Sequence, residues 1–380
     1  MITDVKRAAK ACAGDRRLIE CDHDGMQAVR IHAKQDMRTE QVPSPEPGAG
    51  EVRLRVGYVG ICGSDLHYYA DGAAGIFVLR EPLIPGHEMS GVVDLDPTGT
   101  FETGTPVTVH PATWGTAQPD LSDEQRNLWP GGGYLGSAST WPHTAGALAE
   151  HLVVRRDQVR RLPASLPIKR AALAEPLAVG LHALAVAGVI RGKRVLISGS
   201  GPIGLLATAA TAAEGAAEVV CADLLAGPLQ RARLLGEASP LPIGTVQIGV
   251  EELPDSYFDV TLECAGVPQA LHGLLLATRR AGILVQVGNL PDETRPINLA
   301  PLVSKEIQLR GTFRFNNEID AAITLLDKNP QIEQVVTHVL PIEEVDEAFA
   351  IAANPEISGK VLVEVSGPSR ISGPSDLDSG

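Results

Sequence analysis

The sequence is poor in cysteine and in long apolar runs, and each shortage excludes a class of protein. Its 380 residues hold five scattered cysteines, Cys12, Cys21, Cys62, Cys221 and Cys264, a pattern that indicates reduced thiols and not a disulfide framework. Glycine, proline or charge interrupts every apolar stretch before about 18 residues, the length that a membrane-spanning helix needs. The first 25 residues show no signal-peptide pattern. These absences predict a soluble, cytoplasmic protein.

The chain also lacks an excess of positive charge. Its formal net charge is −14 at pH 7, so its field repels nucleic-acid phosphates and anionic lipids, and no local basic patch stands out. We therefore expect neither nucleic acid nor a membrane as a partner.

Two different patterns divide the chain, whose length favours two domains. From Gly25, short runs of alternating apolar and polar residues between glycine and proline turns predict a β-rich, antiparallel domain. From about Ala171, buried strands alternate with helical spacing, which predicts an α/β unit with a parallel sheet. Two later helical stretches and the strand at 360–365 are expected to rejoin the first domain.

These patterns set the expected boundaries. Residues 26–176 and 315–366 form the first domain, and residues 177–314 form the second. Residues 1–25 are an N-terminal extension. Residues 367–380, rich in glycine, serine, proline and aspartate, are expected to be a disordered tail.

A glycine array between a strand and a helix marks a dinucleotide site. Gly199, Gly201 and Gly204 form G-x-G-x-x-G, and Asp223 closes the next strand nineteen positions later. The glycines permit a tight turn and close approach of a pyrophosphate, while the carboxylate accepts hydrogen bonds from a ribose hydroxyl and repels a 2′-phosphate. NAD is thus favoured over NADP. NADP stays a possible cofactor, because the Arg231 side chain could swing back from the following helix toward a 2′-phosphate.

Residues of the types that bind zinc fall in two short segments and at one further position. GICGSDLHYY contains Cys62, LIPGHEMSG contains His87 and Glu88, and Glu175 precedes a proline. A catalytic zinc takes about three such ligands and keeps one position for water or substrate. Taken singly, each residue has an ordinary explanation: core packing for the thiol, a turn for the imidazole and solvation for the carboxylate.

Six motifs carry a resemblance to a known family: CGSDLHYY, PGHEMSGVV, AEPLAVGLHA, SGSGPIG, VQVGN and RGTFRF, in this order. Together they resemble the medium-chain, zinc-containing alcohol and polyol dehydrogenases, especially the sorbitol and L-idonate 5-dehydrogenase branch, from about residue 25 to residue 365. The resemblance implies a GroES-like catalytic domain built from both chain ends and a Rossmann domain between them.

The resemblance also implies roles for single residues around the metal. Cys62 and His87 match zinc ligands, and Glu88 or Glu175 supplies the third, with Glu88 usually the closer in this branch. Glu175 also borders the reacting group. Asp65 matches a carboxylate that orients His87 through its other ring nitrogen.

Other positions match the relay, the substrate pocket and the cofactor site. Ser64 and His67 match a proton relay to solvent. Tyr68 and Arg314 match residues that line the pocket of polyol and sugar-acid relatives. The residues expected to bind the cofactor are Gly199, Gly201, Pro202, Ile203, Gly204, Asp223, Val287 and Gly288.

The chain departs from the family in one lobe. Relatives commonly carry four closely spaced cysteines that bind a structural zinc, and the stretch from His110 to Gly133 has none. We therefore expect one catalytic zinc and no structural zinc, with the loop held by packing of Trp114 or Trp129. A homo-oligomer is expected. Because this lobe often touches a partner subunit in relatives, its change leaves the choice between dimer and tetramer open.

The expected activity is hydride transfer between NAD and a secondary alcohol of a polyol, an L-idonate-like sugar acid or a cyclitol, giving a ketone. One alternative is a zinc-free NAD(P)H reductase on the same fold, which the joint presence of the four candidate ligands disfavours. A second is a non-catalytic nucleotide-binding sensor, which the complete relay disfavours.

Overall fold

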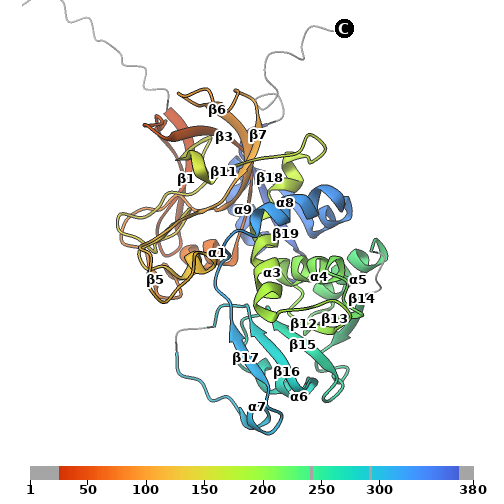
Figure 1. The fold of residues 1–380 in the computed structure, drawn as a ribbon. Helices are drawn as coiled ribbons and strands as arrows, with labels where there is room; N and C mark the ends of the chain where they lie inside the picture. The colour runs from red at the N-terminus through yellow and green to blue at the C-terminus, as the bar shows by residue number, and fades with distance from the viewer. Residues whose placement is uncertain (1–24, 240–242, 291–292, 368–380) are drawn as a thin grey trace, which may run out of the picture.

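The structure is a computed structural model that describes residues 25–239, 243–290 and 293–367. The expected N-terminal extension, apart from its last residue, and the expected tail from residue 368 lie outside the described residues. The described chain forms a β-rich part and a parallel-sheet part, with helices α3 (Ala174–Ala187) and α8 (Ile319–Lys328) at their junction (Figure 1). This is the two-part architecture that the sequence patterns predicted.

The β-rich part is built on a seven-stranded sheet in the order β11-β7-β6-β3-β19-β18, with β10 also pairing with β3. Along β3, Val52, Leu54 and Val56 are buried while the residues between them are partly exposed, as the alternation predicted. The strands are β3 (Glu51–Gly60), β6 (Glu88–Leu95), β7 (Pro106–Val109), β10 (His151–Arg155), β11 (Val159–Arg161), β18 (Val336–Pro341) and β19 (Lys360–Glu364).

Smaller elements surround this sheet. The remaining strands form three antiparallel pairs: β1 (Gly25–Ala33) with β2 (Asp36–Pro43), β4 (Ala73–Ala74) with β5 (Phe77–Val78), and β8 (Ala112–Thr113) with β9 (Gly133–Tyr134). The helices here are α1 (Gly63–Asp71), α2 (Ile168–Ala171), α9 (Val345–Ala352) and the 3-10 turns η1 (Asp123–Leu128), η2 (Arg156–Gln158) and η4 (Ile342–Glu344).

The other part is a six-stranded parallel sheet in the order β14-β13-β12-β15-β16-β17. Both faces are covered, because Val195 and Ile197 of β12 pack into one core cluster and Leu196 into another. The strands are β12 (Arg194–Ser198), β13 (Glu218–Asp223), β14 (Ile243–Gln247), β15 (Phe258–Glu263), β16 (Thr278–Gln286) and β17 (Gln308–Gly311).

Helices cover the two faces of this sheet. α3, α4 (Pro202–Ala213), α5 (Ala226–Glu237) and α8 contribute to the core cluster on one face, and α6 (Ala270–Ala277) and α7 (Ala300–Ser304) pack on the other. Cys221 is fully buried in the first cluster, as expected of a small apolar residue. Among the described helices, none is long and apolar enough to cross a bilayer.

The chain returns to the β-rich part later than the expected boundary at residue 315. Phe315, Ile319 and Leu326 share the core of α3 and α4, and so does the 3-10 turn η3 (Pro330–Val335). The chain joins the β-rich sheet only at β18. The residues from 315 to 335 are therefore apolar on the side that faces the parallel-sheet core.

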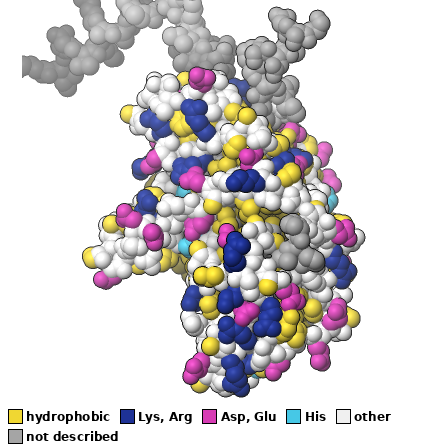
Figure 2. All heavy atoms as spheres, turned by 45° about the vertical axis from the view of Figure 1, so that its right-hand side comes forward, with side chains coloured by type: hydrophobic (Ala, Val, Ile, Leu, Met, Phe, Trp, Pro, Cys, Tyr) yellow, Lys and Arg dark blue, Asp and Glu magenta, His cyan; other side chains and the backbone are white. Residues whose placement is uncertain are grey.

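The surface carries charges of both signs. On the face in Figure 2, lysine and arginine side chains are interspersed with aspartate and glutamate. That face has no continuous basic field of the kind that binds a phosphate backbone.

Candidate active site

Three candidate metal ligands meet where β3, α1 and β6 come together. Cys62 caps the N-terminus of α1, and Glu88 is the first residue of β6, directly after His87. Within the described chain, these three side chains place their ligand atoms within 4.8 Å of one another. His87 and Glu88 are buried and Cys62 is partly exposed. Glu175 stands outside this closest group.

The Glu88 carboxylate is paired with a buried lysine that the sequence analysis missed. Lys360 Nζ lies 2.7 Å from Glu88 Oε1 and 2.6 Å from Oε2, and it also donates to the carbonyl of Ile61 at 2.9 Å. Despite the short distance, Glu88 Oε2 accepts no hydrogen bond of good geometry. The only sequence signal was a lysine directly before the apolar run Val361–Val363 of β19.

Asp65 positions the two ligand-bearing segments through their backbones. Its Oδ2 accepts from the Cys62 N–H at 2.9 Å and its Oδ1 from the Gly86 N–H at 3.1 Å. Both carboxylate oxygens thus accept from main-chain donors, and the expected contact of Asp65 with the ring nitrogen of His87 stays a prediction. The buried carboxylate still acts next to His87, whose neighbour in the chain it binds.

Glu175 lies in the first turn of α3. Tyr134, the last residue of β9, binds it. The Tyr134 hydroxyl donates to Glu175 Oε1, and the Tyr134 ring meets the His87 ring edge to face, with centroids 5.5 Å apart. Burial raises the pKa of Glu175, an effect that the nearby His87 opposes. Tyr134 was not among the expected site residues, because it lies in a stretch without periodicity.

The cluster favours a positive charge at its centre. Burial alone would lower the pKa of His87, but the adjacent Cys62 sulfur, Glu175 and Asp65 raise it to about 10. A partly exposed cysteine sulfur, a buried imidazole and a carboxylate oxygen without a well-directed donor are the donor set that zinc takes. The residues therefore fit the metal that the motifs imply.

The two relay candidates lie on α1 at different depths. Ser64 is partly exposed in the first turn, next to the Asp65 that binds Cys62. His67 is exposed one turn later, with its Nδ1 3.3 Å from Asp71 Oδ2. The helix thus leads from the cluster toward solvent.

The two substrate candidates lie differently from each other. Tyr68 is 1% exposed, and its hydroxyl accepts from the Ala138 N–H at 3.0 Å. Arg314 stacks its guanidinium on the Tyr134 ring, 4.1 Å from the centroid, with Phe313 and Phe77 at 4.8 Å and 6.0 Å. Arg314 also has a φ of 53°, a strained conformation that costs of order 1–3 kcal/mol and often marks a functional position.

The glycine array forms a cradle at the start of α4. Gly199 has a φ of 90°, and a side chain there would lie 2.7 Å from the Ala265 nitrogen. A side chain on Gly204 would overlap the Gly199 carbonyl, whereas one on Gly201 would point into open space. The free space at Gly201, before the helix residues Pro202 and Ile203, fits a pyrophosphate at a helix N-terminus.

Other cofactor candidates share the carboxyl edge of the parallel sheet. Val287 and Gly288 follow β16, and both donate to the Glu263 carbonyl at 2.8 Å. Asp223 ends β13 and accepts from the N–H groups of Ser200 and Leu225 at 2.7 Å and 3.0 Å. This edge is where parallel α/β sheets bind dinucleotides.

Arg231 is the cation because of which NADP stayed a possible cofactor. Its guanidinium binds main-chain carbonyls. Its Nη1 donates to the Glu356 carbonyl at 3.2 Å, and its Nη2 donates to the Pro355 carbonyl. The side chain thus links α5 to the segment before β19. It does not face Asp223 with a free guanidinium.

The lobe without cysteines is held by aromatic and polar contacts. His110 lies between the rings of Trp114 and Phe315, each with its centroid 4.8 Å away, which realises the expected Trp114 packing. Its Nε2 donates to the Asn316 carbonyl at 2.5 Å, and its Nδ1 accepts from the Ala112 N–H at 3.2 Å. Burial lowers the pKa of His110 to about 4, so the neutral ring is retained.

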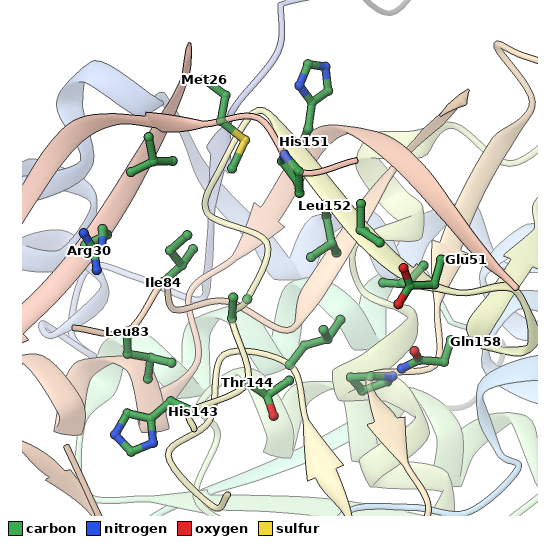
Figure 3. Close-up of a pocket in the computed structure, with 18 of the residues that line it drawn as sticks. Met26, Arg30, Glu51, Leu83, Ile84, His143, Thr144, His151, Leu152 and Gln158 are labelled. Atoms are coloured by element: carbon green, nitrogen blue, oxygen red, sulfur yellow. The ribbon is translucent and has the colours of Figure 1, made fainter. Parts of the chain in front are cut away.

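A cavity of about 710 Å³ lies in the β-rich part, away from the cluster (Figure 3). Its wall combines Met26, Leu83 and Leu152 with polar side chains that already have partners, since His151 contacts Ser44 at 3.0 Å. None of the expected metal, relay, cofactor or substrate residues lines it. This cavity is therefore not the candidate active site.

Comparisons with known proteins agree with the geometry. The family model described as "Alcohol dehydrogenase GroES-like domain" matches residues 48–164, and the one described as "Zinc-binding dehydrogenase" matches residues 202–328. Sorbitol dehydrogenase from Gallus gallus is 38% identical over 333 residues, covering 85% of this chain and 92% of that protein. L-idonate 5-dehydrogenase (NAD(P)(+)) from Escherichia coli is 34% identical over 305 residues, covering 80% and 88%.

The fold comparison leads to the same group. The crystal structure of L-idonate 5-dehydrogenase from Escherichia coli matches with a TM-score of 0.82 at 31% sequence identity. The match covers 90% of this chain and 98% of that chain.

Proposed function

Because the chain belongs to the zinc-binding, GroES-like alcohol dehydrogenase family, as its motifs predicted, we propose that it transfers hydride between NAD and a secondary alcohol of a polyol, a sugar acid or a cyclitol. Membership makes the chain a dehydrogenase with a GroES-like domain and a Rossmann-like domain, and the non-catalytic sensor is set aside. The relatives named for sorbitol and L-idonate support the substrate class.

One observation carries the substrate proposal: the Arg314 guanidinium, stacked on Tyr134, has no ion-pair or hydrogen-bond partner within the described chain. Among the described residues, this guanidinium contacts three aromatic rings. A guanidinium in a partly buried place is normally paired with a carboxylate or several acceptors. A substrate that brings hydroxyl or carboxylate oxygens supplies them.

Each residue of the cluster has a role in this proposal. Cys62, His87 and Glu88 would hold a single zinc, which when bound supplies the Lewis acidity that makes an alcohol easier to deprotonate. Glu175, held by Tyr134, borders the reacting group. Because four clustered cysteines are absent from the lobe, we propose no second, structural zinc.

The proton leaves by a relay along α1. The Ser64 hydroxyl would accept it from the alcohol while releasing its own proton toward His67, whose exposed imidazole passes a proton to water. Arg314 orients the remaining hydroxyls or the carboxylate. These roles are proposals for this chain's own side chains.

NAD is the proposed cofactor. The Asp223 carboxylate would accept from a ribose hydroxyl and would repel a 2′-phosphate. Arg231 is committed to the Pro355 and Glu356 carbonyls, which supports the preference. The homo-oligomeric state and the cytoplasmic location expected from the sequence stay predictions.

A paired measurement tests the proposal. The purified protein, loaded with zinc, is assayed with NAD over a panel of sorbitol, L-idonate, a cyclitol and the primary alcohol ethanol, and its metal content is determined in parallel. We expect a higher kcat/KM on the hydroxylated secondary alcohols than on ethanol. Equal or better activity on ethanol, or undiminished turnover after metal removal, would contradict the proposal.

A further inference from the structure

A second cavity, of about 290 Å³, lies between the irregular segment 112–133 and the residues after β17. Aromatic side chains dominate its wall, which includes Trp114, Trp129 and Phe313, and the chain at 131–133 contributes three glycines. Trp114 contacts His110 and also Arg126, whose guanidinium carbon lies 5.2 Å from the ring centroid and which lines the cavity as well. We call this space the tryptophan cavity.

Polar groups around the tryptophan cavity lack partners. Trp129 Nε1 and Ser139 Oγ are buried and make no hydrogen bond, and both residues line the cavity. Arg314, which also lines it, has only ring contacts among the described residues. Buried polar groups without partners are uncommon and costly. In the cavity of Figure 3, by contrast, Arg30 contacts Glu40 and His151 contacts Ser44.

Arg314 joins the tryptophan cavity to the ligand cluster. Its guanidinium stacks on Tyr134 at 4.1 Å, and the Tyr134 hydroxyl binds Glu175. The Tyr134 ring in turn contacts the His87 ring, with centroids 5.5 Å apart. A substrate whose reacting alcohol lies at the cluster therefore has the cavity within reach on the far side of Arg314.

We propose that the tryptophan cavity is a subsite for a second hydroxylated ring, so that the preferred substrate is a glycosylated polyol or glycosylated sugar acid. The inference rests on the proposed function and deepens it. The apolar face of a sugar ring packs on aromatic side chains, while its hydroxyls at the ring edge bind polar groups. The second ring packs on Trp114 and Trp129, and Arg314 binds oxygens between the two rings.

Other ligand classes fit the wall less well. A purely aliphatic group would pack on the rings but would leave the Arg314 guanidinium, which has only ring contacts among the described residues, without acceptors. An unextended six-carbon chain that reaches only Arg314 would leave the aromatic wall unfilled. A ring with several hydroxyls satisfies both requirements at once.

A binding measurement tests the subsite without activity. The chain has three tryptophans, of which Trp141 is 60% exposed and does not line the cavity. In a Trp141→Phe protein, the fluorescence of Trp114 and Trp129 should change saturably with maltitol, a sorbitol that carries a glucose ring, and with lactobionate, a gluconate that carries a galactose ring. Sorbitol and gluconate should give much smaller changes at equal concentration. The metal-free protein serves as well as the loaded one.

Steady-state kinetics give the second arm. Trp129→Leu should lower the ratio of kcat/KM for maltitol to kcat/KM for sorbitol by about fivefold, since one aromatic contact is lost. Trp141→Leu, a tryptophan change outside the cavity, should leave that ratio unaltered. The same comparison is made for lactobionate and gluconate.

The outcomes separate the two claims. If the protein oxidises sorbitol or gluconate but neither fluorescence nor the kinetic ratio distinguishes the ring-bearing partner, the subsite proposal is wrong and the proposed function stands. If the glycosides bind by fluorescence but no hydroxylated compound is oxidised, the proposed function fails instead. A fluorescence change that follows protein concentration and not ligand concentration would mean that a second copy fills the cavity, and would overturn the subsite.

Discussion

The Tyr134 hydroxyl donates a hydrogen bond to Glu175, and the ring of the same tyrosine carries the Arg314 guanidinium 4.1 Å from its centroid. One side chain thus joins β9, helix α3 and the residues after β17. The carboxylate at the edge of the ligand cluster and the cation expected to bind substrate are positioned by a single aromatic residue.

Removing that hydroxyl should weaken both the fold and catalysis. Tyr134→Phe leaves a buried carboxylate without its donor, a loss of about 1–3 kcal/mol in the free energy of unfolding, and should lower kcat. Urea unfolding and steady-state kinetics measure the two effects. The control is Tyr58→Phe, because the Tyr58 hydroxyl also donates to a carboxylate, Glu364 at 3.0 Å, outside the cluster. An unchanged kcat in Tyr134→Phe would show that Glu175 needs no such positioning.

Loss of a ligand should remove the metal but not the cofactor. Cys62→Ala and His87→Ala should each abolish turnover and bring the zinc content close to zero, because a three-ligand site cannot spare one. NAD affinity, measured by calorimetry, should change little, since the glycine cradle is built on the other domain. Two zinc ions per chain in the unsubstituted protein would refute the single-metal expectation.

The Asp223 carboxylate should control the choice of cofactor. Asp223→Ser should lower the ratio of kcat/KM with NAD to kcat/KM with NADP by about tenfold or more, because like charges about 4 Å apart repel by roughly 1–4 kcal/mol. Arg231→Ala is the control, and it should leave the preference in place because that guanidinium binds carbonyl oxygens of 355 and 356. The measurement is kcat/KM for both cofactors. If Arg231→Ala changes the cofactor preference and Asp223→Ser does not, our assignment is wrong.

Ser64 should matter for proton transfer alone. Ser64→Ala should lower kcat by about 10²–10⁴-fold while zinc content and NAD affinity stay nearly unchanged. His67→Ala should cost less, since an exposed histidine hands its proton to nearby water. A wild-type kcat in Ser64→Ala, together with a solvent isotope effect that marks proton transfer as rate-limiting, would disprove the relay.

His110 should make the stability fall in mild acid. The unfolded chain takes up a proton on this histidine near pH 6.5, whereas the folded protein does so only near a pKa of about 4. The stabilisation is therefore complete above the unfolded pKa and is lost as the pH falls toward the folded pKa, with about 2 kcal/mol lost between pH 7 and pH 5.

A pair of substitutions checks this assignment. His110→Gln should remove that part of the pH dependence in urea unfolding, and His338→Gln, at a partly exposed histidine, should keep it. If both variants lose stability between pH 7 and pH 5 as the unsubstituted chain does, another group is responsible.

Local patterns determined much of this protein. The turn at Gly199 and the start of α4 depend on residues adjacent in sequence, so the cofactor cradle could be predicted from spacing alone. The motifs likewise predicted the Cys62, His87 and Glu88 group, because each ligand lies at the end of a strand or the start of a helix. The order of strands and helices followed from periodicity for the same reason.

Only the tertiary structure decided what surrounds those ligands. Lys360 reaches Glu88 across 272 positions, and Tyr134 reaches Glu175 across 41. Such pairs form when the burial of apolar faces brings distant strands together, and no local spacing records which polar residue will then lie beside which. The sequence by itself therefore determined the family, the cofactor cradle and the ligand types, while packing decided that Asp65 binds backbone, that Arg314 lies on Tyr134, and that the lobe without cysteines encloses a cavity.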